Sequence, residues 1–245
     1  MAELLTLEDS EVHIWCTDIS QVSSALLPSY LELMSDQEKE RNGRYRFEHL
    51  RAADKITRAL ARTVLSRYAD IDPADWSFTQ GEHGKPEVSN PGIKLRFNLS
   101  HTSHMVACVV TRCHDIGLDI ENIERDNDVL AIADRYFSKP ELNQLFSLPA
   151  DQQQDRFFDY WTLKEAYMKA DGRGISLGLG NFSFEIADTI SISFSEKIPQ
   201  DAAAWRFQLF HPNDTHRMAV AIRTGADNQQ ELVVRHFETI PLQLP

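Results

Sequence analysis

The sequence predicts an α+β protein made of two similar halves, and three observations support this prediction. Strand-like segments occur in groups, and helical segments stand between these groups instead of alternating strictly with single strands. Two stretches, "RFNLSHTSHMVACVV" from Arg96 and "RFQLFHPNDTHRMAVAI" from Arg206, each indicate a strand, a turn containing histidine and a second, apolar strand. Other pairs of similar segments accompany these two in the same order along the chain.

Each half is predicted to contain the same elements in the same order. The first element is a strand, "VHIWCTDI" at 12–19 in the first half and "IGLDIENI" at 116–123 in the second. A helix start follows, "SDQE" at 35–38 and "SKPE" at 138–141, because Ser-x-x-Glu is the signature of a capping box. A long helix and a set of antiparallel strands complete each half. The number of residues between the two members of a pair changes only slowly from one pair to the next along the chain, which indicates an internal duplication.

The boundary between the halves is predicted near Arg112–Asp115, which gives domains of residues 1–112 and 113–245. No linker rich in Gly, Ser or Pro interrupts the sequence at this point, so the halves are expected to pack tightly.

The 245 residues carry a net charge of −12, which argues against general binding to nucleic acid. Between positions 39 and 67, however, nine Lys or Arg residues accompany three Asp or Glu residues. This basic segment indicates either a local anionic ligand or a solvated helix face with i,i+4 ion pairs.

No apolar run approaches the roughly 18 residues of a membrane-spanning helix, and the first residues lack the basic start of a signal peptide. The three cysteines are odd in number and lack CxxC spacing, which suits a reducing compartment. We therefore expect a cytoplasmic protein that binds neither nucleic acid nor membrane.

The stretch "FFDYWTLKEAYMKADGRG" at 157–174 predicts a helix with a carboxylate in its apolar stripe. At 100° per residue, Phe158, Trp161 and Met168 fall on the same side as Glu165. Burying an unpaired charge costs several kcal/mol, so Glu165 is expected to face a cation or a polar ligand. Gly172 is predicted to cap the C-terminus of this helix.

Two more carboxylates are predicted on the strand "IGLDIEN", where Gly117, Asp119 and Glu121 share one face. Three hard oxygen ligands, Asp119, Glu121 and Glu165, suit Mg²⁺, and Gly117 is expected to leave room for a ligand. The alternative is that Lys169 neutralises Glu165 while the strand carboxylates are a solvated edge.

The first half offers groups that bind anions. "NLSHT" is predicted to place Ser100 and His101 at a turn that ends a strand, where hydroxyl, imidazole and amide groups bind phosphate oxygens. Lys85 lies in a Gly-rich turn, and Arg41 belongs to the basic segment.

The halves diverge at these positions. Asp119 and Glu121 correspond to Trp15 and Thr17, and Ser100 corresponds to Phe210. One active site assembled from both halves is therefore expected.

These residues resemble the 4′-phosphopantetheinyl transferase family. "IGLDIE" followed by "WTLKEAYMK" looks like the paired signature of that family, and "EKERNGRYRF", "GKP" and "FNLSH" are similar to its coenzyme A-binding segments. The length and the duplication resemble the surfactin-synthetase-activating class, in which two α+β halves pack as an intramolecular pseudo-dimer. The resemblance implies a monomer that transfers the phosphopantetheine arm of coenzyme A to a serine of an apo carrier protein and releases 3′,5′-ADP.

The resemblance also implies residue roles. It makes Glu165 and Lys169 catalytic, with Glu165 as the base for the incoming serine. It implies Mg²⁺, with Mn²⁺ as a substitute, on Asp119, Glu121 and Glu165. The implied coenzyme A contacts are Arg41, His83, Gly84, Lys85, Asn98, Ser100, His101 and Lys169.

Two other functions fit parts of the pattern. A Mg²⁺-dependent nuclease also uses clusters of Asp and Glu with Lys, although the net charge opposes it. A non-catalytic binding module stabilised by a metal is the other alternative.

The carrier protein is expected to dock on residues 135–148, "RYFSKPELNQLFSL". This segment offers Phe137, Leu142, Leu145 and Phe146 with Arg135 and Lys139. The alternative is that its apolar residues are the buried face of a helix.

Overall fold

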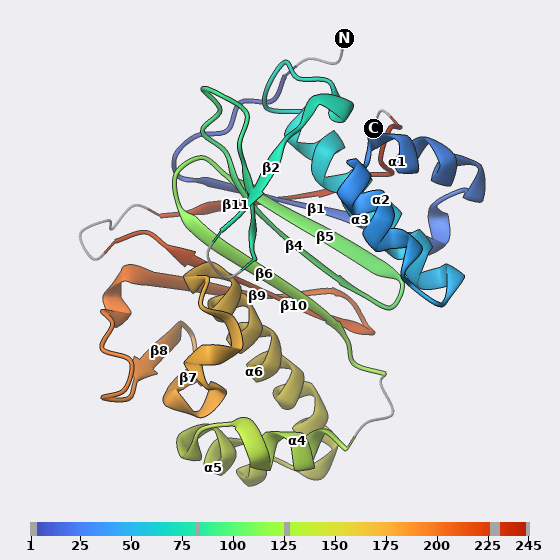
Figure 1. The fold of residues 1–245 in the computed structure, drawn as a ribbon. Helices are drawn as coiled ribbons and strands as arrows, with labels where there is room; N and C mark the ends of the chain where they lie inside the picture. Colours follow the sequence, from blue (N-terminus) through green and yellow to red (C-terminus); the bar gives the residue numbers. More distant parts are fainter. Residues whose placement is uncertain (1–3, 82–83, 125–127, 226–230, 244–245) are drawn as a thin grey trace. The chain divides into compact units, whose positions relative to one another are not determined.

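The computed structural model describes residues 4–81, 84–124, 128–225 and 231–243, and it has the predicted α+β fold class (Figure 1). The chain divides into two compact units, Met1–Cys113 with Glu231–Pro245, and His114–Gln230. The predicted boundary after residue 112 lies one residue away from this division. The C-terminus differs from the prediction: residues 231–245 were predicted in the second half but belong to the first unit, because their strand pairs with its first strand.

The first unit contains a four-stranded sheet with the order β11-β1-β5-β4. Strand β1 runs antiparallel to β5 and parallel to β11, while β4 and β5 form an antiparallel hairpin. The bounds of the strands are β1 Glu11–Asp18, β4 Arg96–Thr102, β5 Met105–Thr111 and β11 Val233–Glu238.

Three helices and a small hairpin accompany this sheet, namely α1 Leu27–Leu33, α2 Asp36–Gly43, α3 Glu48–Leu65, β2 Phe78–Gln80 and β3 Pro86–Val88. Helix α3 is amphipathic, and its apolar side chains Ile56, Leu60 and Val64 share one buried cluster with Val106 and Cys108 of β5. Burial of apolar side chains of this size stabilises the unit by about 1.5–3 kcal/mol each. Cys108 is fully buried, as a small core residue would be.

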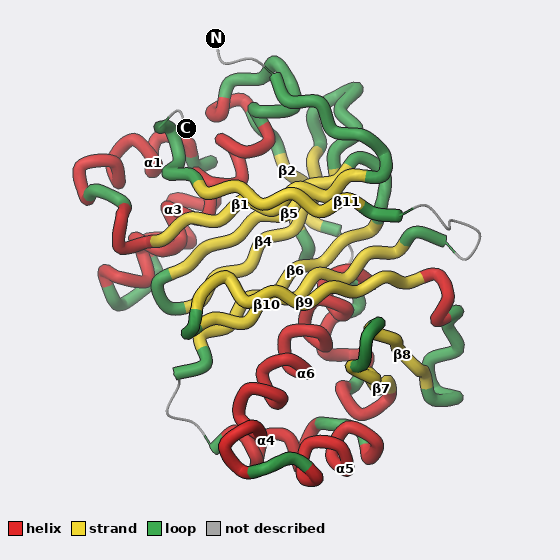
Figure 2. Tube along the Cα trace, turned by 180° about the vertical axis from the view of Figure 1, so that it is seen from behind, coloured by secondary structure: helices red, strands yellow, loops and turns green. Residues whose placement is uncertain are grey.

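The second unit contains a three-stranded sheet with the order β6-β10-β9, and helix α6 lies along one of its faces (Figure 2). The elements are β6 Asp115–Asn122, α4 Val129–Tyr136, α5 Lys139–Ser147, α6 Ala150–Asp171, β7 Phe182–Ile186, β8 Ile190–Phe194, β9 Trp205–Asn213 and β10 His216–Arg223. Short 3₁₀ turns lie at Ile19–Gln21, Ser24–Leu26, Pro73–Asp75, Gly174–Leu177, Leu179–Asn181 and Ala202–Ala204.

The two units repeat one connectivity, as an internal duplication predicts. In each unit, the first long strand pairs antiparallel with the third, which pairs with the second, giving β1-β5-β4 and β6-β10-β9. Both predicted capping boxes are present, at Ser35 and at Ser138. The strands also pair in the same register in both units. In the first unit, Cys16, Ala107 and Ser100 lie side by side across the sheet. In the second unit, Ile120, Met218 and Phe210 occupy the same three places. Ser100 and Phe210 are therefore equivalent positions.

None of the helices in the described ranges is both long and apolar enough to cross a membrane.

Candidate active site

Helix α6 carries the predicted catalytic residues, and it begins before the predicted stretch, at Ala150, and ends at Asp171. Aromatic side chains along it, Phe157, Phe158 and Tyr167, are buried in the core of the second unit. The helix stops at Gly172, which adopts a φ of 89° and donates its N–H to the carbonyl oxygen of Met168 at 3.0 Å. The predicted C-cap is therefore confirmed, and only glycine adopts this conformation without strain.

Gly117 on β6 decides how closely this helix approaches the sheet. A Cβ atom at this position would lie far inside van der Waals contact of the carbonyl oxygen of Ala166 and the amide nitrogen of Ala170. The prediction that Gly117 leaves room for a ligand was wrong, because the backbone of α6 fills that room. The close approach brings the catalytic helix onto the strand that carries Asp119.

Asp119 and Lys169 form an ion pair between this strand and this helix. The Nζ atom of Lys169 lies 2.7 Å from Oδ1 of Asp119, and it donates a further hydrogen bond to the carbonyl oxygen of Leu118 at 3.1 Å. Asp119 is only 4% exposed, so its charge depends on this partner. The alternative reading paired Lys169 with Glu165, whereas the structure gives it a direct contact with the strand carboxylate.

Glu165 lies close enough to Asp119 and Lys169 for its ionisation to depend on both. Burial raises the pKa of Glu165 above its usual range, the Asp119 carboxylate raises it further, and Lys169 opposes this rise. The carboxylate in the apolar stripe therefore faces a charged strand edge, and the predicted grouping of Asp119, Glu165 and Lys169 exists in the second unit.

Glu121 follows on the same face of β6, two residues beyond Asp119, which is about 7 Å along a strand. No group of three His, Cys, Asp or Glu side chains within the described ranges is arranged as a metal site. The metal ligand set of Asp119, Glu121 and Glu165 thus stays a prediction, for which two members lie close together.

The predicted anion contacts of the first unit come from three separate elements. Arg41 lies on α2 and is exposed, and it has no carboxylate partner among the described residues. The hairpin between β2 and β3 holds Gly84, with a φ of 83°, and Lys85, whose carbonyl oxygen accepts from the N–H of Gly81 at 2.8 Å. His83 lies outside the described residues.

Strand β4 supplies Asn98, Ser100 and His101. Asn98 and Ser100 are buried and share one face, whereas His101 is exposed and points to the other face. The predicted turn at Ser100 and His101 was wrong. The strand continues to Thr102, which pairs with Met105, and the turn consists of Ser103 and His104, whose φ is 70°. A strand explains why adjacent residues here have opposite exposures.

The structure supports ion pairing for part of the basic segment at 39–67, and a local anionic ligand stays a prediction. Four of its nine basic residues pair with acids in the first unit: Arg44 with Glu40, Arg51 with Glu48, Arg58 with Asp54 and Glu38, and Arg62 with Glu38. These four are the ion-paired helix face. Arg41 differs from them because its charge is available to a ligand.

The docking segment at 135–148 is partly buried. Phe137 and Leu145 belong to the core of the second unit, so the alternative reading is correct for these two residues. Phe146 is 47% exposed. Tyr136 is 40% exposed, although the prediction did not name it. The exposed apolar surface of this segment therefore retains Phe146 from the predicted set and gains Tyr136.

A buried ion pair was missed by the sequence analysis. Lys164, next to Glu165, is fully buried, and its Nζ lies 2.8 Å from Oε2 of Glu141 at the start of α5. Its remaining donors go to the carbonyl oxygens of Leu179 at 2.7 Å and Phe182 at 2.9 Å. A lysine between Leu163 and Ala166 inside an apolar helix face was the available signal. This pair attaches the far side of α6 to α5.

Comparison with known proteins identifies the family of the chain. The family model described as "4'-phosphopantetheinyl transferase superfamily" matches residues 115–221, which include Asp119, Glu165 and Lys169. A second family model, "4'-phosphopantetheinyl transferase, N-terminal", matches residues 21–113. The two matches lie in different units of the structure.

Similar proteins cover most of the chain. The 4′-phosphopantetheinyl transferase HetI of Nostoc sp. is 34% identical over 223 residues, which is 89% of this chain and 90% of that protein. The 4′-phosphopantetheinyl transferase Sfp of Bacillus subtilis is 29% identical over 78% of this chain and 83% of its own. A putative 4′-phosphopantetheinyl transferase of Synechocystis sp. is 31% identical over 84% and 86%. With this coverage and with the paired carboxylates in place, the chain belongs to the 4′-phosphopantetheinyl transferase family.

Proposed function

We propose that the chain transfers the 4′-phosphopantetheine group of coenzyme A to a serine of an apo acyl or peptidyl carrier protein. The observation that carries this proposal is the ion pair of Asp119 with Lys169 between β6 and α6, together with the influence of both charges on the pKa of Glu165. Two carboxylates and an ammonium group, held together at a closely packed strand and helix, are suited to a metal-bound diphosphate. This is the chemistry that the family name implies.

The predicted metal is Mg²⁺, with Mn²⁺ as a substitute, on Asp119, Glu165 and Glu121. The donor set fits a hard cation because all three donors are carboxylate oxygens. The charge of Asp119 also contributes to the raised pKa of Glu165, an effect that a bound cation would relieve. When bound, the metal supplies neutralisation of charge on the diphosphate.

The remaining steps of the proposed reaction are assigned to side chains of this protein. Glu165 accepts the proton of the serine hydroxyl as the serine oxygen bonds to the phosphorus that carries the pantetheine arm. The bond from this phosphorus to the bridging oxygen breaks, and 3′,5′-ADP leaves with that oxygen. Lys169 stabilises the negative charge that develops on the leaving phosphate. The proposed contacts to coenzyme A are Arg41, His83, Gly84, Lys85, Asn98, Ser100 and His101, of which Arg41, Lys85, Ser100 and His101 are assigned to its phosphates.

The proposed surroundings of the enzyme follow from its charge and its surface. We expect a monomer in the cytoplasm that acts on carrier proteins and not on nucleic acid or membranes. With a net charge of −12, its overall field does not attract an acidic partner, so carrier binding must depend on local groups. Phe146 and Tyr136 are the exposed apolar candidates.

The test is transfer of labelled coenzyme A to an apo carrier protein by wild type, Glu165→Gln and Asp119→Asn. Both substitutions keep the volume of the side chain, so the fold should survive. We expect kcat to fall by about 10²–10⁴-fold for Glu165→Gln, the range for loss of a general base. Asp119→Asn should also weaken binding of Mg²⁺ with coenzyme A in calorimetry. Wild-type kinetics in either variant would contradict the proposed site.

A further inference from the structure

Helix α2 has an unusual means of attachment to the first unit. Of its eight residues, only Asn42 is buried, and no apolar side chain of the helix enters the core. A short amphipathic helix normally packs through an apolar stripe. Because α2 lacks one, its position must depend on polar contacts.

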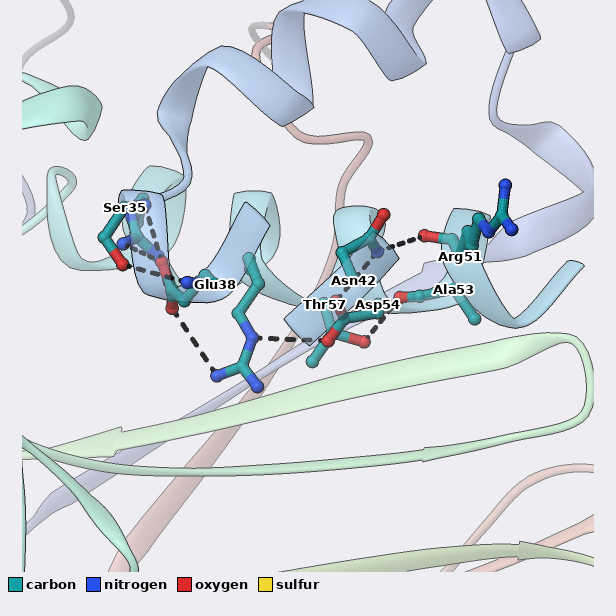
Figure 3. A network of polar contacts seen from close by, with 9 residues as sticks. Ser35, Glu38, Asn42, Arg51, Ala53, Asp54 and Thr57 are labelled. Carbon is teal, nitrogen blue, oxygen red and sulfur yellow. Dashed lines mark hydrogen bonds and ion pairs between the residues drawn. The ribbon is translucent and has the colours of Figure 1, made fainter. Parts of the chain in front are cut away.

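Asn42 makes two of these contacts, both to α3 or its first turn. Its side-chain amide donates to the carbonyl oxygen of Arg51 at 3.0 Å and to Oδ2 of Asp54 at 2.9 Å (Figure 3). Asn42 is 3% exposed and Asp54 is 8% exposed, so water does not replace these bonds at low cost. Each bond is directional, and together they fix both the distance and the rotation of α2 relative to α3.

Glu38, one turn earlier on the same face of α2, makes the second set of contacts. Its Oε2 atom lies 2.6 Å from Nη2 of Arg62, and its Oε1 lies 3.7 Å from Nη1 of Arg58. It also accepts from the N–H of Ser35 in the capping box (Figure 3). Burial alone would raise the pKa of Glu38, but Arg62, the Ser35 amide and Arg58 outweigh burial and lower it. Asn42 and Glu38 thus form a polar latch between α2 and α3.

Arg41 is the residue whose position this latch determines. It adjoins Asn42 in sequence, lies about 100° round the helix from it, and has no carboxylate partner in the described ranges. A rotation of α2 by about 30° would move a side-chain atom roughly 6 Å from the helix axis by about 3 Å. That shift exceeds what a hydrogen bond to a phosphate oxygen tolerates.

We propose that Asn42, Asp54 and Glu38 are positioning residues that hold Arg41 against a phosphate of coenzyme A. The inference rests on the proposed function, because it assumes that Arg41 binds this substrate. According to this proposal, the latch contributes to the affinity for coenzyme A, whereas residues of the second unit carry out the chemical step.

The first experiment compares Asn42→Ala with wild type in the transfer assay, at saturating apo carrier protein. We expect the KM for coenzyme A to rise about three- to tenfold, because a displaced contact loses part of its strength, while kcat stays within about twofold. Circular dichroism and thermal unfolding should match those of wild type, which checks that the variant keeps its overall fold. Asn42→Leu, which keeps the buried volume but removes the amide, serves if Asn42→Ala is insoluble.

A double-mutant cycle separates positioning from general stability. Arg41→Ala should raise the KM for coenzyme A by at least about tenfold, the effect of losing one charge-assisted hydrogen bond. In Arg41→Ala/Asn42→Ala the second substitution should add nothing to this KM, because the latch acts only through Arg41. A merely structural role of Asn42 would add the same factor in both backgrounds.

Two controls complete the design. Asp54→Asn keeps an oxygen that accepts from Asn42 and should retain the wild-type KM, whereas Asp54→Leu should behave like Asn42→Ala. Arg44→Ala removes an exposed charge of the same helix region, one that already pairs with Glu40 at 2.6 Å, and should leave KM unchanged. Additive effects of Arg41→Ala and Asn42→Ala on the KM for coenzyme A would contradict the proposal that the latch positions Arg41. An unchanged KM in Arg41→Ala would instead contradict the substrate contact assumed by the proposed function.

Discussion

The two units repeat one connectivity but use the same strand positions in different ways. In β6 the inward positions carry Gly117 and Asp119, which meet the backbone of α6 and the ammonium group of Lys169. The equivalent residues of β1 are His13 and Trp15, and both reach the hydroxyl of Tyr68, at 2.8 Å each. One unit thus has charges at a close helix contact, where the other has large rings that complete its core.

The difference extends to the edge of each sheet. Phe237 of β11 stacks on Trp15 with ring centroids 4.3 Å apart, and Arg235 donates from Nε to Glu11 at 2.8 Å. The sheet of the second unit has no strand equivalent to β11 among the described residues. The aromatic residue Trp15 of β1 provides a surface on which the C-terminal segment packs as a fourth strand. The two units therefore differ at a few inward positions of otherwise equivalent strands, which carry an ion pair in one unit and packed aromatic rings in the other.

The largest effect is expected from removing that fourth strand. Deletion of residues 231–245 takes away the β1–β11 ladder, the stacking on Trp15 and the acceptor for the hydroxyl of Tyr30, the carbonyl oxygen of Pro241 at 2.8 Å. We expect amide exchange to accelerate strongly in peptides covering β1 and β5, because backbone and aromatic partners are lost together. Peptides covering β6 and β10 are the internal control. Equal acceleration in both sets would mean that the segment stabilises the whole chain and not one unit.

The second effect is expected at the closest helix contact. Gly117→Ala places a methyl group against the carbonyl oxygen of Ala166, so α6 must move away from β6. We expect a loss of roughly 3 kcal/mol in the free energy of unfolding, the upper end for overpacking, together with a fall in kcat. Denaturant titration and the transfer assay measure the two. Ala221→Gly, at the position of β10 that pairs with Gly117, is the control, since it alters the same interface without adding atoms. Wild-type stability in Gly117→Ala would show that the helix approach is not fixed by this residue.

These contacts indicate how much of the molecule the sequence could predict. The repeated strands, both capping boxes and the grouping of Asp119, Glu165 and Lys169 follow from short patterns, since spacing along one element determines which side chains share a face. Gly117 was misread because the absence of a side chain looks the same whether a ligand or a helix fills the space. The pairing of β11 with β1 joins residues more than 200 positions apart, and no local pattern encodes such a partner.

The other wrong predictions arose for the same reason, namely that local patterns do not encode tertiary partners. Ser100 and His101 were predicted at a turn because Asn, Ser and His favour turns, but ladder pairing with β5 carries the strand to Thr102. Phe137 and Leu145 resemble an exposed patch in sequence, yet they pack against α6. The exposure of an apolar residue depends on tertiary contacts, whereas its place on an element depends on local spacing.

The third effect concerns two equivalent histidines. His101 of β4 is exposed on a strand that carries predicted coenzyme A contacts, whereas His211, the equivalent residue of β9, lies 3.7 Å from Oδ1 of Asp159. We expect His101→Ala to raise the KM for coenzyme A about tenfold, because one charge-assisted contact is lost. His211→Ala should be nearly silent. Initial rates at varied coenzyme A concentrations measure both, and equal effects would argue against a division of labour between the units.

The smallest effect expected is a pH dependence of stability confined to the first unit. Burial lowers the pKa of His13 below its ordinary value of 6.5, and although Glu11 opposes this, the lowering prevails. The hydroxyl of Tyr68 accepts from Nε1 of Trp15 and can donate to Nδ1 of His13 only while that nitrogen is unprotonated. Because the folded unit favours neutral His13, the stabilisation by this residue is complete above about pH 6.5 and is lost as the pH falls towards the lowered pKa.

Amide exchange measures this effect. Exchange in β1 should accelerate between about pH 7 and 5 after correction for intrinsic rates, and His13→Gln should remove part of this change. Burial lowers the pKa of His236 as well, so His236→Gln should remove a further part of the change. Acceleration of equal size in β6 would locate the responsible groups outside the first unit.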